Sequence, residues 1–184
     1  MKNKPAIVLS LLLMLSLLAI GGCGQPVEPT PEPPDTMTYD VVLYFTNMEY
    51  VETGDQSLPV LLTETSEIEV GAEEEPYHVL LKALSTPVEE AHGTMISEQL
   101  VIHKVAYSPE GSDLLLVDLA KEGLTGGSLG ESLLISQIVE TLLANESLAG
   151  DRPTPTRVQF LVDGEIVESL MGHIDASAPF ESKQ

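Results

Sequence analysis

The chain has 184 residues, of which 29 are acidic and only 8 are lysine or arginine, so its formal net charge is −21. Nucleic acids and anionic lipids repel such a chain, and no basic run reverses the charge locally, so we exclude a nucleic-acid partner. The simplest interpretation is a solvated acidic surface, although it would also attract a basic partner.

The first 22 residues have the three-part pattern of a secretory signal. Lys2 and Lys4 supply positive charge, and an uncharged, mainly aliphatic run follows from Ala6 to Ile20. That run is shorter than the roughly 18 residues or more that a membrane-spanning helix requires. We therefore predict a cleaved export signal over residues 1–22.

The single cysteine of the chain follows this run directly and cannot form an internal disulfide. Residues 20–23, Ile-Gly-Gly-Cys, resemble the bacterial lipobox, in which the cysteine receives a diacylglycerol and becomes the mature N-terminus. Two or more acyl chains anchor a protein stably, since each buried CH₂ contributes about 0.8 kcal/mol. We therefore predict lipid attachment at Cys23 and a location on the extracytoplasmic face of the cell membrane. The alternative is an ordinary secreted protein in which Cys23 has no such role.

Residues 23–38 form a linker rich in proline and acidic residues. Such a segment cannot build a core and stays extended and semi-rigid, so we expect a spacer that holds a domain away from the membrane. The composition changes near Tyr39. We predict one domain over residues 39–178, which is an ordinary domain size, followed by a frayed tail over residues 179–184.

The first half of this domain is predicted to contain strands and one helix. Residues 40–45 indicate a strand, and residues 58–62 and 66–70 are weaker strand pieces. A helix is predicted from Pro76, because proline fits the first helical turn and the preceding acids favour the positive end of the helix dipole. Its apolar stripe is Tyr77, Leu80, Leu81 and Leu84.

The second half begins with two strands, at residues 99–107 and 113–119, that are predicted to form a hairpin. The second strand is apolar on both faces, so we expect it to be central in its sheet. A second helix follows two glycines, and Ser128 and Glu131 have the spacing of a capping box. The predicted buried stripe is Leu134, Ile135, Ile138, Val139 and Leu142, with Ser132, Ser136 and Glu140 on the opposite side.

A last hairpin is predicted around Asp163 and Gly164, between a strand at residues 156–162 and a short one at residues 165–167. The order of elements predicts an α+β fold, a mostly antiparallel sheet packed by two helices in a single small domain.

No pattern identifies a catalytic, cofactor or metal centre. The four histidines, at positions 78, 92, 103 and 173, lack the short spacing of a metal site. The glycine-rich segment 126–130 lacks the Lys-Ser/Thr of a phosphate loop, and we interpret it as a loop before a helix. Residues 145–147 fit the acceptor pattern for N-glycosylation, which we attribute to chance in a bacterial lipoprotein.

Asp118 is the one acid that we single out as a candidate catalytic group, because it lies on a predicted strand where it could be buried. The acids at positions 73–75 already have an explanation at a helix start. Our expectation for Asp118 is a local hydrogen bond, and the alternative is the general acid or base of an enzyme that acts on the cell wall.

Five segments in order resemble the GerMN domain, the sporulation and germination module of bacterial envelope lipoproteins. They are Val42–Phe45, Pro76–Leu84, Leu115–Ala120, Ser136–Leu142 and Val158–Gly164. The resemblance covers about residues 40–175 and implies a small fold similar to ring-building modules. It also implies binding or scaffolding of protein or cell-wall partners, without catalysis. Some members carry two such domains, and the single domain here leaves oligomer formation open.

The sequence thus predicts a lipid-anchored, non-enzymatic cell-envelope protein. Two alternatives stay open. One is a cell-wall-acting enzyme that uses an acid such as Asp118. The other is a small solute-binding lipoprotein, which is the weaker of the two because a single domain offers no second lobe to close over a solute.

Overall fold

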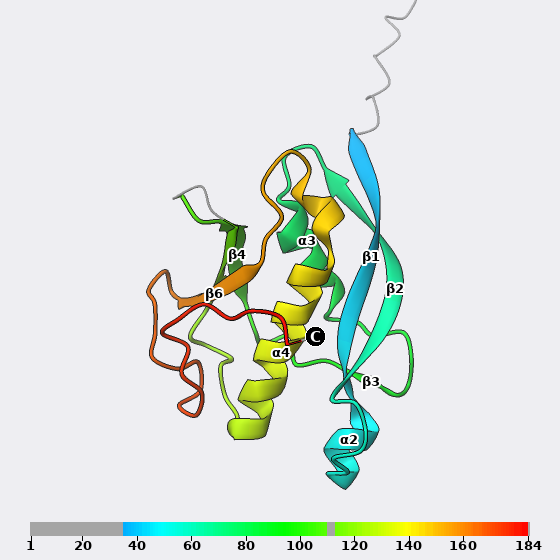
Figure 1. Cartoon of the computed structure of the whole chain (residues 1–184), viewed down its shortest axis with the longest axis vertical. Helices are drawn as coiled ribbons and strands as arrows, with labels where there is room; N and C mark the ends of the chain where they lie inside the picture. Colours follow the sequence, from blue (N-terminus) through cyan, green and yellow to red (C-terminus); the bar gives the residue numbers. More distant parts are fainter. Residues whose placement is uncertain (1–34, 110–112, 184) are drawn as a thin grey trace, which may run out of the picture. The chain divides into compact units, whose positions relative to one another are not determined.

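The strands in the described part of the chain divide into two three-stranded sheets (Figure 1). A computed structural model describes residues 35–109 and 113–183. The predicted signal, Cys23 and the predicted linker up to residue 34 therefore lie outside the described residues. The elements follow in the order β1 (Thr36–Asn47), α2 (Met48–Thr53), β2 (Leu61–Gly71), α3 (Pro76–Ala83), β3 (His92–Gly93), β4 (Ile102–Tyr107), β5 (Leu114–Leu119), α4 (Ser128–Ala144), a short 3₁₀ helix (Glu146–Ala149) and β6 (Arg157–Val162).

The first sheet has the order β2-β1-β3 and is antiparallel throughout, whereas the second has the order β4-β5-β6. In the second sheet β4 pairs with β5 antiparallel, as the predicted hairpin requires, and β5 is central, as its apolar faces predict. β6 pairs with β5 in parallel, because α4 carries the chain back across the sheet between them. The α+β class and the mostly antiparallel pairing are confirmed, and the division into two sheets adds to them.

Helices α3 and α4 lie in the middle of the domain, with β1 and β2 on one side and β4 and β6 on the other (Figure 1). The predicted stripe of α3 is fully buried there, since Tyr77, Leu80, Leu81 and Leu84 have no exposed surface. Pro76 occupies the first turn of α3, as predicted. These side chains meet the inward faces of both sheets in one core, including Phe45 of β1 and Phe160 of β6.

Helix α4 differs from its prediction in two respects. Its N-cap is Gly127, with no side-chain hydrogen bond, so the capping box of Ser128 and Glu131 does not form. The helix is also buried on almost every side, and Glu140, predicted to face outward, is only 6% exposed. The cause is the C-terminal segment, which covers that side: the Ser182 hydroxyl and the Lys183 amide donate to Glu140 at 2.7 and 2.9 Å. The expected fraying beyond Phe180 is therefore absent through Lys183.

The last predicted hairpin forms only as a turn. Asp163 and Gly164 both have positive φ, 51° and 84°, the geometry that favours Asp-Gly in a tight two-residue turn. Val162 and Glu165 then form an isolated bridge instead of the start of a strand. Residues beyond the turn leave the sheet and continue as a loop, so the predicted strand at residues 165–167 is wrong.

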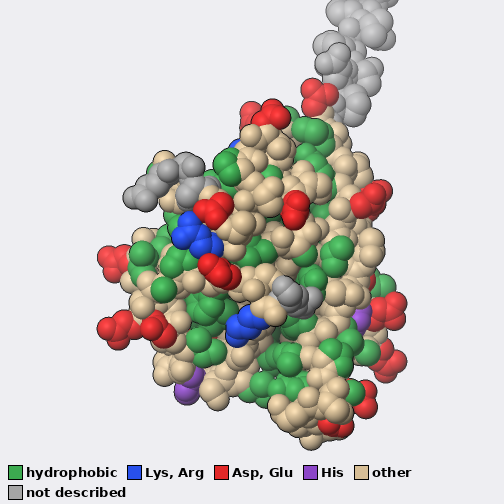
Figure 2. All heavy atoms as spheres, in the orientation of Figure 1, with side chains coloured by type: hydrophobic (Ala, Val, Ile, Leu, Met, Phe, Trp, Pro, Cys, Tyr) green, Lys and Arg blue, Asp and Glu red, His purple; other side chains and the backbone are tan. Residues whose placement is uncertain are grey.

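The surface charge and the lengths of the helices complete the description of the fold. Acidic side chains are spread over the visible face of the domain, between apolar and uncharged areas (Figure 2). Within residues 35–109 and 113–183, no helix has the length and apolar character needed to cross a membrane.

Candidate functional site

A buried carboxylate organises the loop that follows β6. Glu131, in the first turns of α4, has no exposed surface and no ion-pair partner among the described residues. We call residues 163–177 the C-terminal loop. It lies beside the start of α4, in orange and red next to yellow-green (Figure 1). Since burying a lone charge is costly, the loop has to supply hydrogen bonds to Glu131.

Five donors of the C-terminal loop converge on this carboxylate. Oε1 accepts from the Ser169 hydroxyl at 2.7 Å and from the Leu170 and Met171 amides, both at 2.9 Å. Oε2 accepts from the His173 amide at 2.8 Å and the Ile174 amide at 3.2 Å. Backbone groups of a surface loop that would otherwise bond to water are thereby fixed to a helix inside the domain.

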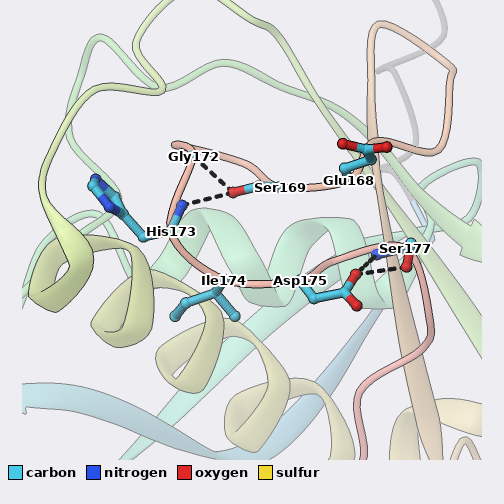
Figure 3. A pocket seen from close by; sticks show the side chains of 7 residues that line it. All are labelled: Glu168, Ser169, Gly172, His173, Ile174, Asp175 and Ser177. Carbon is cyan, nitrogen blue, oxygen red and sulfur yellow. Dashed lines mark hydrogen bonds between the residues drawn. The ribbon is translucent and has the colours of Figure 1, made fainter.

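The environment of Glu131 keeps it ionised at neutral pH. Burial of the carboxyl acts to raise its pKa, but the hydrogen bonds from the Ser169 hydroxyl and the loop amides outweigh that effect, so the net pKa lies below the ordinary value. Ser169 has a second role, because its oxygen also accepts from the amides of Gly172 at 2.7 Å and His173 at 3.0 Å (Figure 3). One carboxylate and one hydroxyl thus determine the shape of the loop.

The C-terminal loop surrounds a polar hollow of about 460 Å³ (Figure 3). Its lining consists of Glu168, Ser169, Gly172, His173, Ile174, Asp175 and Ser177. Two parts of the loop are joined by the Ala176 amide, which donates to the Glu168 carbonyl at 2.8 Å. Gln159 of β6 also holds the loop, because its side-chain amide donates to the Ala176 carbonyl at 2.8 Å.

Two acidic residues and a histidine are among the residues that line this hollow. Asp175 accepts from the Ser177 hydroxyl at 2.5 Å and amide at 2.9 Å, and these bonds lower the pKa of its carboxyl. Glu168 and His173 stand at opposite sides of the hollow in Figure 3. The arrangement can accept hydrogen bonds from a polar or cationic group of a partner.

Asp118, the sequence-based candidate for catalysis, has a structural role. It is half-buried near the end of β5, and its Oδ1 accepts from the Gly164 amide at 2.9 Å. The expected hydrogen bond is present but is not local, since Gly164 lies 46 residues further along the chain, and it supports the Asp163-Gly164 turn. Asp118 is not part of the hollow in the C-terminal loop.

The four histidines do not gather at one place, although His78 and His103 line the same hollow between α3 and β4. His92 bonds to Glu64 at 3.1 Å and stacks on Phe45, and His103 bonds to Asp163 at 3.3 Å. The pKa of His78 is lowered, chiefly by burial and then by the nearby Lys82. His173 lines the hollow. Within the described residues, no three His, Cys, Asp or Glu side chains come together as a metal site.

Asn145, the acceptor residue of the glycosylation pattern, is buried and ties α4 to β1. Its Oδ1 accepts from the Val42 amide at 2.9 Å, and its Nδ2 donates to the carbonyls of Val42 at 2.8 Å and Thr141 at 2.7 Å. The Tyr77 hydroxyl donates to the Asn145 carbonyl at 3.3 Å. At 4% exposure Asn145 offers no surface for a glycan, which agrees with a chance match.

An ion pair that sequence reasoning missed secures the loop after α4. Arg152 bonds to Glu75 at 2.9 Å, and its guanidinium lies 4.4 Å from the centre of the Tyr107 ring. The Tyr107 hydroxyl donates to the Pro153 carbonyl at 2.9 Å. These partners come from three distant segments, and no spacing in the sequence links them. For Glu131, the only signal was an acid next to the buried Leu133 and Leu134.

The fold defined by these elements is that of a GerMN domain. The first GerMN domain of the sporulation protein GerM from Bacillus subtilis superposes with a TM-score of 0.56 at 10% identity, over 79% of this chain and 98% of that chain. Residues 42–168 match the family model Germane, described as sporulation and spore germination. The match covers more than half of the chain, which therefore belongs to this family, as the resemblance predicted.

Two further solved structures are similar. One, described as a candidate lipoprotein from Clostridium perfringens, has a TM-score of 0.47 and 18% identity over 83% of this chain and 93% of that chain. The tandem GerMN domains of Bacillus subtilis GerM give a TM-score of 0.49 at 15% identity, over 83% of this chain and 48% of that chain. This chain thus spans about half of the tandem structure. A comparison with curated proteins gives no match.

Proposed function

We propose that the protein is a lipid-anchored, non-enzymatic component of the cell envelope in sporulation or spore germination. Its GerMN domain binds a protein or cell-wall partner through the C-terminal loop. The observation that carries this proposal is the family match over residues 42–168. The lipobox at Cys23 and the proline-rich linker support the anchored location, since together they would hold the domain at a distance from the membrane.

A binding role is supported by what the acidic residues do. Asp118 holds a turn, Asp113 bonds to Arg157 at 2.7 Å, and Glu131 holds the C-terminal loop. Each of these acids satisfies groups of its own fold. A general acid–base pair needs two acids with separated pKa values beside one cleft, and none of these three acids lines the hollow of the C-terminal loop.

The C-terminal loop is favoured as the binding surface because it is polar, exposed at its tip and held rigidly. Five hydrogen bonds to Glu131 fix it before any partner arrives, so a partner would not have to order it. Such preorganisation reduces the entropic cost of binding.

The anchor is tested by replacing Cys23 with Ser and separating membranes from the soluble fraction. We expect the wild-type protein in the membrane fraction and the Cys23→Ser protein outside it, with unchanged circular dichroism. A variant that stays with the membrane would refute the anchor.

The binding surface is tested in cells with a triple variant, Glu168→Gln, His173→Gln and Asp175→Asn, which changes the hollow and leaves Glu131 in place. A matched control, Glu67→Gln with Glu69→Gln, changes two exposed acids of β2. We expect reduced sporulation or germination with the loop variant only. Equal efficiency of all three strains, at equal protein levels, would contradict a role for the C-terminal loop.

A further inference from the structure

A second hollow, of about 540 Å³, shares Ser169 with the first. It lies where β5 and β6 end: Lys121 and Leu124 follow β5, Val162 is the last residue of β6, and Val167 and Leu170 come from the C-terminal loop. β5 and β6 are parallel neighbours joined through α4. In open sheets built from parallel strands that are joined by helices, ligands bind beyond the carboxyl ends of the strands.

The walls of this second hollow are fixed by hydrogen bonds. The Asp163 amide donates to the Leu119 carbonyl at 3.0 Å, and the Lys121 amide donates to the Asp163 carboxylate at 3.4 Å. Ser169 and Leu170, on the opposite wall, are held by Glu131. The hollow is therefore formed in advance, and its volume falls within the roughly 300–1,000 Å³ of small-molecule sites.

The lining combines an apolar part with two exposed charged side chains of opposite sign. Leu124, Val162 and Val167 are partly buried and pack against the core. Lys121 and Glu165 also line the hollow, and in the described part of the chain neither side chain has an ion-pair partner. A third charge, on Asp163, faces His103 at 3.3 Å.

These features select one chemical class of ligand. A purely anionic molecule would be repelled by the carboxylates of Asp163 and Glu165, and a purely cationic one would be repelled by Lys121. An uncharged apolar molecule would gain nothing from either charge. We propose that the second hollow binds a zwitterion with an aliphatic body, namely a free amino acid or a short peptide. The ligand's carboxylate contacts Lys121, its ammonium contacts Glu165, and its side chain packs on Leu124 and Val167. This site does not depend on the proposed function.

The test is an NMR titration of the full-length chain in detergent micelles with leucine and with leucyl-leucine. Two blocked probes accompany them: N-acetyl-leucine, which lacks the ammonium, and leucinamide, which lacks the carboxylate. We expect saturable shifts confined to the amides of residues 121–124 and 162–170 with at least one zwitterion. Each blocked probe should bind about tenfold more weakly or worse, the usual cost of losing a charged hydrogen bond.

Two variants locate the contacts. Lys121→Met and Glu165→Gln should each weaken the binding of the zwitterion about tenfold. Two control variants, Lys82→Met at an exposed lysine of α3 and Glu69→Gln on β2, should leave its binding unchanged. The proposal is overturned if neither zwitterion shifts these amides at tens of millimolar. It is also overturned if the blocked probes bind as well as leucine, or if the pocket variants behave as the controls.

Discussion

The replacement of Glu131 by Gln is the sharpest test of how the C-terminal loop is held. The change keeps the shape of the side chain, removes its charge and converts one acceptor oxygen into an NH₂ donor. If the amide oxygen faces the Ser169 hydroxyl and the Leu170 and Met171 amides, the NH₂ group faces the amides of His173 and Ile174, which are also donors. His173 keeps its bond to Ser169, so Ile174 loses its acceptor altogether.

The expected loss of stability follows from these hydrogen bonds. Three charge-assisted hydrogen bonds become neutral ones, and one part-buried donor, the Ile174 amide, loses its acceptor while facing the new NH₂ group. An unsatisfied buried donor costs about 1–3 kcal/mol, so we expect Glu131→Gln to lower the free energy of unfolding by about 2–5 kcal/mol. For a domain whose total stability is about 5–15 kcal/mol, this is a large share.

The assay is urea denaturation followed by circular dichroism, with Glu122→Gln as a control for loss of a nearby exposed charge. The control should change the free energy of unfolding by less than about 0.5 kcal/mol. If Glu131→Gln were as stable as this control, the five hydrogen bonds would not hold the loop and the reasoning would fail.

The dependence on pH gives a second readout of the same residue. The pKa of Glu131 is depressed in the folded protein, so its contribution to stability is fully present above the ordinary carboxyl value of 4.5. That contribution is lost as the pH falls through the lower, folded pKa. The difference in stability between wild type and Glu131→Gln should therefore be constant near neutral pH and shrink in acid. A difference that grows below pH 4.5 would contradict an ionised Glu131.

The remaining predictions concern three other residues. Asn145→Ala removes the bonds to Val42 and Thr141, so it should lower the free energy of unfolding, measured by urea denaturation, by about 2–4 kcal/mol. Glu146→Ala, at the exposed neighbouring residue, should lower it by less than about 0.5 kcal/mol. Tyr77→Phe removes one buried hydrogen bond, from the Tyr77 hydroxyl to the Asn145 carbonyl, and should lower the free energy of unfolding by about 1 kcal/mol. An unchanged free energy of unfolding would mean that this bond contributes nothing to stability. Asp118→Asn keeps an oxygen for the Gly164 amide, so sporulation and germination should proceed as in wild type; a severe defect with a normally folded protein would instead favour the enzyme alternative.

The sequence by itself determined the elements whose signals are local. Pro76 and the apolar stripe behind it define α3, and the aliphatic run of β5 places that strand at the centre of its sheet. Asp163 and Gly164 determine a tight turn, because their backbone conformations suit that pair. The five ordered segments identified the GerMN resemblance, which the family match confirms.

Helix α2 shows how a local signal can be overlooked. The Asn47 side chain caps its start by accepting from the Glu49 and Tyr50 amides at 3.1 and 3.4 Å, and Gly54, with φ of 68°, ends it. Both are ordinary helix boundary residues, but only six residues lie between them, too few for an apolar stripe to appear in the sequence.

Only the tertiary structure decided what the buried acids do. The spacing of Ser128 and Glu131 fits a capping box, yet Glu131 turns to a loop 38 to 43 residues further along the chain. Glu140 likewise accepts from residues 42 and 43 positions away. A carboxylate near a helix start accepts hydrogen bonds from whichever unpaired amides reach it, and the packing of the C-terminal loop against α4 determines which amides those are. Because that packing joins segments that are distant in sequence, no local pattern could predict it.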